Sequence, residues 1–132
     1  MVTIKSHTDL SQSMILSKIL PLESADMCWT YDFDTKCFTI KMYPYSRLVI
    51  PKYADSKITN PIPAWSLSAL LDILPNRICL DNENYYLNYK KDKVEYLGPL
   101  TWDGQKCITS KANTLVDACY EMILKLHELN LL

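Results

Sequence analysis

Glycine is almost absent from this chain. Only Gly98 and Gly104 are glycine among 132 residues, whereas seven residues are proline. Loops that wrap a phosphate group, in P-loop and Rossmann proteins alike, need several glycines in a short span. The sequence therefore argues against both kinds of phosphate site. The prolines instead divide the chain into short segments, because proline cannot continue a helix.

Length and composition indicate one folded domain covering residues 1–132, with 48% hydrophobic and 22% charged residues. This balance is typical of a globular rather than a disordered chain. The formal net charge is -1, so no overall field attracts the protein to nucleic acid or to anionic lipid.

The cellular compartment is predicted from what the sequence lacks. The N-terminus "MVTIKSHTDLSQS" has no apolar signal-peptide core, and no run of about 18 apolar residues occurs. The five cysteines form no C-x-x-C pair, which favours reduced thiols in a cytoplasm. We expect a cytoplasmic protein with no membrane partner and no cofactor; the cysteines are residues 28, 37, 79, 107 and 119.

Three segments have the apolar spacing of helices. The first, residues 8–20, begins with a capping-box pair, Asp9 and Gln12, and stops at a proline. The second begins after Ser66, because serine is a favoured residue at the N-cap of a helix. The third, the clearest, begins where Thr114 precedes Asp117 by three residues. The segment after the first helix, "PLESADM", predicts one further short helical turn.

Strands are predicted wherever apolar side chains alternate between tight turns. Residues 28–43 read as a hairpin whose turn lies at 34–36, and "RICLD", "NYYLNYK", "VEYLG" and "KCITS" read as four more strands. Between them, Lys91-Asp92 forms a turn and "PLTWDG" a longer one. A connector at 43–63 includes an edge strand at 48–50. The expected fold is α+β: a small antiparallel sheet of hairpins covered on one face by two or three amphipathic helices.

Cys119 and His127 are the first candidates for chemistry. Eight residues along a helix rise by about 12 Å, so the two side chains cannot hold one zinc ion or form a thiolate–imidazole pair. Packing is the favoured interpretation of Cys119. Asp32 and Asp34 suit a hard cation, but aspartate is also common in solvated turns, which we favour. No metal site is predicted.

An enzyme is not the favoured class, because neither G-x-S-x-G nor H-E-x-x-H occurs and no catalytic residue is indicated. The alternative left open is an enzyme with an unrecognised site formed in space by His7, a cysteine and carboxylates.

The stretch "YYLNYKKDKVEY", residues 85–96, combines aromatic and basic side chains. On a strand, Tyr86 and Lys90 share one face, while Tyr85 and Tyr89 share the other. Rings that stack bases beside Lys90 and Lys91 are typical of proteins that bind single-stranded nucleic acid. Tyrosine is equally an ordinary strand residue. Nucleic-acid binding by this hairpin is therefore an alternative hypothesis rather than the leading one.

The leading hypothesis is a non-catalytic interaction or accessory protein that binds another protein. It rests on aromatic side chains outside the predicted core, a residue class enriched in interfaces. Self-association is a further hypothesis, because the chain ends in the apolar "LNLL". The candidate binding residues are Tyr45, Tyr53, Trp65, Tyr86, Lys90, Lys91 and Trp102.

Three blocks, "SQSMILSKILPLESADMCW", "IPAWSLSALLDILP" and "ANTLVDACYEMILKLHELNLL", carry a family resemblance. In this order they resemble a group of short uncharacterised proteins encoded by Bacteroidales genomes, their phages and mobile elements. The resemblance implies a small intracellular α+β protein from a bacterium or a phage. It implies no activity and no binding residue.

Overall fold

The computed structural model describes residues 5–41 and 61–132. Within these residues the chain divides into two compact units. The N-terminal unit is Ser6–Ala69, and the C-terminal unit is Leu70–Leu132 together with Lys5. Tyr45, Tyr53 and the strand predicted at 48–50 lie outside the described residues. That the whole chain forms one domain stays a prediction.

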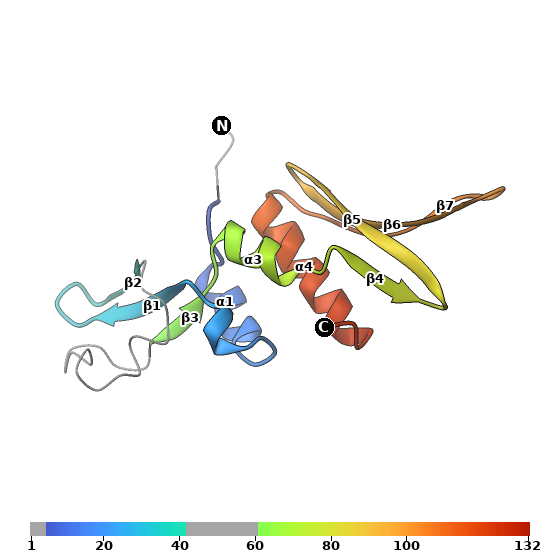
Figure 1. The fold of residues 1–132 in the computed structure, drawn as a ribbon. Helices are drawn as coiled ribbons and strands as arrows, with labels where there is room; N and C mark the ends of the chain where they lie inside the picture. Colours follow the sequence, from blue (N-terminus) through green and yellow to red (C-terminus); the bar gives the residue numbers. More distant parts are fainter. Residues whose placement is uncertain (1–4, 42–60) are drawn as a thin grey trace. The chain divides into compact units, whose positions relative to one another are not determined.

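The N-terminal unit combines short helices with a three-stranded antiparallel sheet in the order β2-β1-β3 (Figure 1). Helix α1 is shorter than predicted, because after Leu16 the chain continues in turns rather than in α-helix. The capping box is present, with the Asp9 side chain accepting from the Gln12 backbone N–H. The elements are α1 (Leu10–Leu16), the 3-10 turn η1 (Leu22–Ser24), β1 (Met27–Asp32), β2 (Cys37–Lys41) and β3 (Ile62–Ala64).

The β1–β2 hairpin turns where the sequence predicts. Asp32 Oδ1 accepts a hydrogen bond from the Asp34 backbone N–H at 2.9 Å, which is the Asx-turn geometry that makes aspartate common in turns. This hydrogen bond lowers the pKa of Asp32. Lys36 closes the turn with φ 58. The two aspartates therefore have a turn role that needs no cation.

Strand β3 was not predicted. It has only three residues, Ile62–Ala64, and includes Pro63 directly opposite Cys28 of β1. Proline is tolerated there because, among the described strands, β3 lies at the edge of its sheet. The pairing brings the chain that follows β3 back to the N-terminal segment, where the Thr8 N–H donates to the Trp65 carbonyl.

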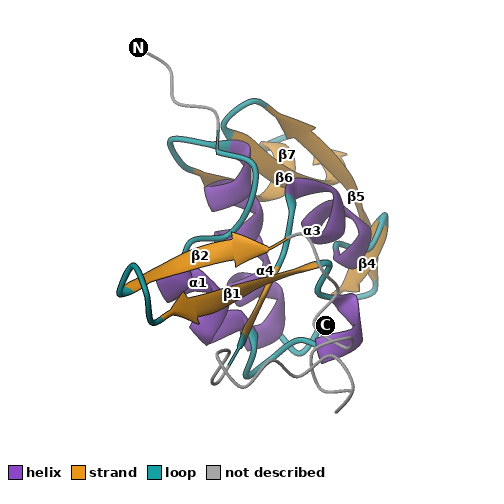
Figure 2. Ribbon diagram, turned by 90° about the vertical axis from the view of Figure 1, so that its left-hand side faces the viewer, coloured by secondary structure: helices purple, strands orange, loops and turns teal. Residues whose placement is uncertain are grey.

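The C-terminal unit is a four-stranded antiparallel sheet in the order β4-β5-β6-β7, together with helix α4 (Figure 2). Helix α3 (Leu67–Ile73) contains the boundary between the units. Its N-terminus has the predicted cap, since the Ala69 N–H donates to Ser66 Oγ. The elements are β4 (Arg77–Leu80), β5 (Glu83–Lys90), β6 (Lys93–Thr101), β7 (Gly104–Lys111) and α4 (Leu115–Glu128).

Helix α4 contacts β6 and β7, and the core of this unit lies between them. Val94 and Tyr96 of β6 are fully buried, as are Cys119 and Met122 of α4. Burial raises the pKa of Tyr96, whose hydroxyl donates to the Pro75 carbonyl at 2.7 Å. The sheets are antiparallel and a helix packs on the four-stranded one, so the predicted α+β class is confirmed. The strands form two sheets, whereas one sheet was predicted.

The β6–β7 hairpin extends beyond its neighbours in the sheet. Pairing between β5 and β6 stops at Leu97, and a bulge follows between Leu97 and Leu100. Gly98 lies in this bulge, and a Cβ placed on it would come within 2.4 Å of the Tyr85 ring. Glycine is therefore required there for the buried ring to cross the β6 backbone. Beyond this point β7 is the only described strand that pairs with β6.

Candidate functional site

Among the described elements of the C-terminal unit, α4 covers one face of the four-stranded sheet. Side chains directly opposite each other on antiparallel strands share a face, and α4 contacts the face that carries Val94 and Tyr96. The other face, here called the open face, has two rows of particular interest. One row is Arg77, Tyr86, Leu97 and Cys107, and the other is Lys90, Lys93 and Lys111.

The lysine row crosses three strands. Lys90 of β5 is directly opposite Lys93 of β6, which is directly opposite Lys111 of β7. Like charges in this position repel and destabilise a sheet. Lys90 and Lys111 are exposed, and neither forms a salt bridge with another described residue. Folding alone gives no reason for this arrangement.

Glu95 lies on the same face, between the two rows. Its Oε1 accepts from Asn88 Nδ2 at 2.8 Å, and its Oε2 is 3.4 Å from Lys93 Nζ. The hydrogen bond from Asn88 lowers the pKa of Glu95, although desolvation opposes this effect. The buried carboxylate forms an ion pair with Lys93 and also feels the charge of Lys90 from farther away. Lys90, Lys111 and Arg77 form no ion pair with another described residue.

Tyr86 is the aromatic side chain of the open face. Its exposed fraction is 56%, and Arg77 lies directly opposite it on β4. Tyr89, which the sequence places on the opposite face from Tyr86, is also partly exposed, whereas Tyr85 is buried. The pairing of β5 with β6 places Tyr86 and Lys90 on the open face and Tyr89 on the face of Val94, as the alternation predicts.

The tip of the β6–β7 hairpin carries the most exposed apolar side chains in the described residues. Leu100 is 80% exposed and Trp102 is 95% exposed. The predicted long turn is a tight one, because Thr101 pairs with Gly104, whose φ is 121. Glycine permits this backbone conformation. A tryptophan that packs against almost nothing has no evident role in folding.

A second aromatic cluster lies in the N-terminal unit. Tyr31 contacts Phe33 and Phe38 edge-on, with ring centroids 5.0 and 5.2 Å apart. Phe33 and Phe38 are largely exposed. These rings pack edge to face against Tyr31, a favourable arrangement of aromatic side chains, and this packing accounts for part of their placement. The sequence did not single them out.

Trp65 requires a correction as a binding residue. It has no exposed surface, and its indole N–H donates to Ser24 Oγ at 2.9 Å. The proline-rich segment before Trp65 forms strand β3, which fixes this ring in the interior rather than at a rim. The neighbouring Ser66 has no free nucleophilic hydroxyl either, because it donates to the Asp26 carboxylate and accepts from the backbone of α3.

Cys119 and His127 do not form a site. Cys119 is buried, and burial raises the pKa of its thiol to about 12, so it is no nucleophile near neutral pH. His127 is exposed on α4. His7 lies near Trp29 in the N-terminal unit, with the two rings tilted and their centroids 5.7 Å apart. Among the described residues, no three histidine, cysteine or acidic side chains gather in a geometry that suits a metal ion.

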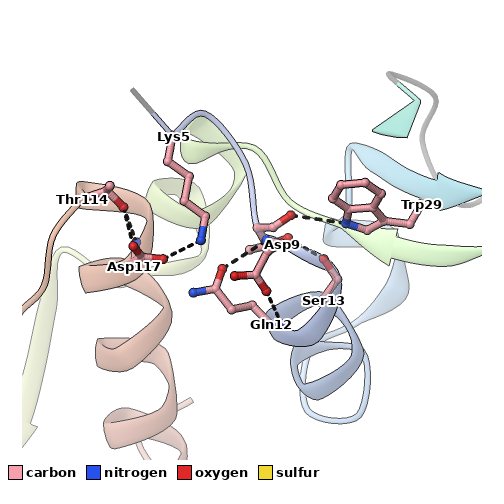
Figure 3. A network of polar contacts seen from close by, with 8 residues as sticks. Lys5, Asp9, Gln12, Ser13, Trp29, Thr114 and Asp117 are labelled. Carbon is pink, nitrogen blue, oxygen red and sulfur yellow. Dashed lines mark hydrogen bonds and ion pairs between the residues drawn. The ribbon is translucent and has the colours of Figure 1, made fainter. Parts of the chain in front are cut away.

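The polar contacts near the helix N-termini have a structural role. Thr114 caps α4 by accepting from the Asp117 N–H, and Asp117 is also 2.6 Å from Lys5 Nζ (Figure 3). In the N-terminal unit, the Trp29 indole N–H donates to the Thr8 carbonyl. These hydrogen bonds provide partners for polar groups at a helix end and for partly buried polar groups, as folding requires.

Tyr86, Lys90, Lys91 and Trp102 were predicted from the sequence as candidate binding residues. All four side chains are exposed. Sequence reasoning missed the cations that the sheet brings beside them, because Lys111 and Arg77 are distant in sequence and only the strand register places them on the same face. Leu100 was missed because the turn was expected to be longer.

Comparison with known proteins finds no matching family model, curated protein or solved structure. No helix in the described part of the chain is long and apolar enough to cross a membrane.

Proposed function

We propose that this protein is a non-catalytic interaction protein that binds another protein through the tip of the β6–β7 hairpin. The observation that carries the proposal is the exposure of Leu100 and Trp102, at 80% and 95%. Tryptophan is one of the side chains enriched among the residues that dominate binding energy in interfaces. Covering an aromatic side chain of this kind removes about 150–250 Å² from water, a gross gain of about 4–6 kcal/mol.

The partner that fits is a protein with an apolar pocket, because the two exposed apolar side chains lie at the turn of a two-stranded hairpin. A chain with free thiols at all five cysteines also suits a reducing compartment, and we place the complex in the cytoplasm. The sequence resemblance supports a Bacteroidales bacterium or its phage as the source of the partner.

The test compares the wild-type protein with a Leu100→Ser/Trp102→Ser variant, both immobilised and exposed to such a bacterial lysate. The matched control is Phe33→Ser, which removes an exposed aromatic ring from the N-terminal unit. A protein that the wild type and the control retain, and the tip variant loses, is then purified and its affinity measured by calorimetry. We expect at least a tenfold loss of affinity for the tip variant. Equal retention by all three proteins contradicts the proposal.

Self-association is tested with the same variants. If the apolar pocket belongs to a second copy of this chain, sedimentation shows concentration-dependent dimers for the wild type and monomers for the tip variant. This result would replace the proposed partner by the chain itself.

A further inference from the structure

We infer that the open face of the four-stranded sheet binds single-stranded nucleic acid, through the lysine row and Tyr86. This surface is separate from the hairpin tip, and the inference does not depend on the proposed protein partner. It rests on charge, on the geometry of the strands, and on a cost in stability that folding does not explain.

The first argument is that the net charge conceals a local excess. The whole chain has a formal net charge of -1, which alone disfavours a nucleic-acid partner. On the open face, however, the ionised residues of the paired rows are Arg77, Lys90, Lys93 and Lys111 against Glu95. Four positive charges against one negative charge leave an excess of three on one side of this sheet. The adjoining turn holds Lys91 and Asp92, whose charges cancel.

The second argument is the repulsion within the lysine row. The row holds three lysines directly opposite one another and only one carboxylate, Glu95, beside them, so a repulsion that opposes strand pairing remains. Local features that oppose folding are expected at functional sites, where a ligand relieves them. A chain of phosphates crossing the strands would do so, because neighbouring strands are about 4.8 Å apart and Lys90 and Lys111 therefore about 10 Å apart.

The third argument is the aromatic side chain beside these cations. Tyr86 lies four residues before Lys90 on the same face of β5, about 13 Å along the strand. Its ring is 56% exposed and has Arg77 opposite. An exposed ring and cations on a flat sheet allow a base to stack while its phosphates are neutralised, which is how single strands are bound without a pocket. An acidic peptide offers charge but no base to stack.

The experiment measures fluorescence anisotropy of a labelled oligothymidylate and an oligouridylate of about 20 nucleotides, at about 50 and 200 mM NaCl. Three phosphate contacts predict that affinity falls about twentyfold over this range. The variant Lys90→Gln/Lys111→Gln retains one such contact, so its affinity should fall only about threefold. The matched control, Lys18→Gln/Lys36→Gln, removes the same charge from exposed positions of the N-terminal unit and should behave as the wild type.

Stacking is tested separately at Tyr86. Tyr86→Leu should weaken binding on the order of ten- to a hundredfold at constant salt, the loss of one stacked base, whereas Tyr86→Phe should restore it. The hairpin-tip variant Leu100→Ser/Trp102→Ser should bind the oligonucleotides normally, which distinguishes this inference from the proposed protein interface. Circular dichroism confirms that each variant is folded.

Four results would overturn the inference: no binding at the lower salt concentration, equal weakening by the control lysine pair, competition by polyglutamate as strong as by the oligonucleotide, and equal competition by duplex DNA. Competition by polyglutamate would identify the face as a site for acidic peptides instead.

Discussion

The five cysteines should differ sharply in reactivity in the folded protein. Cys37, Cys79 and Cys107 are exposed, whereas Cys28 and Cys119 are buried. Burial raises the pKa of Cys119 from 9.0 to about 12 and that of Cys28 from 9.0 to about 11. Each unit of pKa lowers the thiolate fraction about tenfold, so the thiolate of Cys119 is reduced about a thousandfold and that of Cys28 about a hundredfold. Because only the thiolate attacks an alkylating reagent, the native protein should show three fast thiols and two slow ones.

The assay is a time course of iodoacetamide alkylation at pH 8, quenched and read for each cysteine by peptide mass spectrometry. In concentrated urea all five thiols should react at similar rates. The control variant is Met122→Ala, which removes buried contacts of α4 and costs about 2–5 kcal/mol. It should accelerate Cys119 through unfolding and leave Cys79 unchanged. If Cys119 of the wild-type protein reacts as fast as Cys79 without urea, it is an accessible nucleophile and the packing argument fails.

Three further predictions concern stability. Gly98→Ala forces the Tyr85 ring from its position and should lower the unfolding free energy, measured by urea titration, by about 1–3 kcal/mol. An unchanged urea midpoint would show that the ring moves freely. Lys111→Gln should raise the unfolding free energy by about 0.2–1 kcal/mol by relieving repulsion in the lysine row, a gain that vanishes in concentrated salt; a loss of stability would contradict the repulsion. The stability contributed by Cys28 and Cys119 should be fully present below pH 9 and disappear as pH rises through their folded pKa values of about 11 and about 12, with a slope of about 1.4 kcal/mol per pH unit for each group. Urea midpoints that do not fall between pH 9 and 11 would refute this.

Local features of the fold were predictable because they depend on neighbours in sequence. The cap at Thr114 and the apolar stripe of α4 follow from a 3.6-residue period, and Asp34 lies in its turn because its N–H bonds to the preceding Asp32. The faces of β5 follow from strand alternation in the same way. Each of these needs no information about residues more than a few positions away.

Features that depend on distant residues could not be predicted. Strand β3 is short and contains Pro63, so nothing in its own sequence marks it, and only pairing with β1 creates it. That pairing also determines the burial of Trp65. The lysine row needs the register of β5, β6 and β7, and a shift of one residue would move Lys111 to the opposite face. For the same reason, the net charge of the whole chain did not predict the excess of cations on the open face.

The lysine row and the hairpin tip lie at opposite ends of β6, and Tyr86, which is opposite Leu97, lies between them. Lys93 begins the strand and Trp102 follows its last residue, a distance of about 30 Å along an extended chain. This exceeds the Debye length of about 8 Å at physiological salt, so charge at the lysine row has little influence at the hairpin tip. Binding of a nucleic acid and of a protein should therefore be independent: saturating oligonucleotide should leave the affinity for the partner of the tip unchanged. A change of more than a few fold in calorimetry would mean that the two ligands touch each other or that the sheet has two arrangements, and it would contradict this prediction.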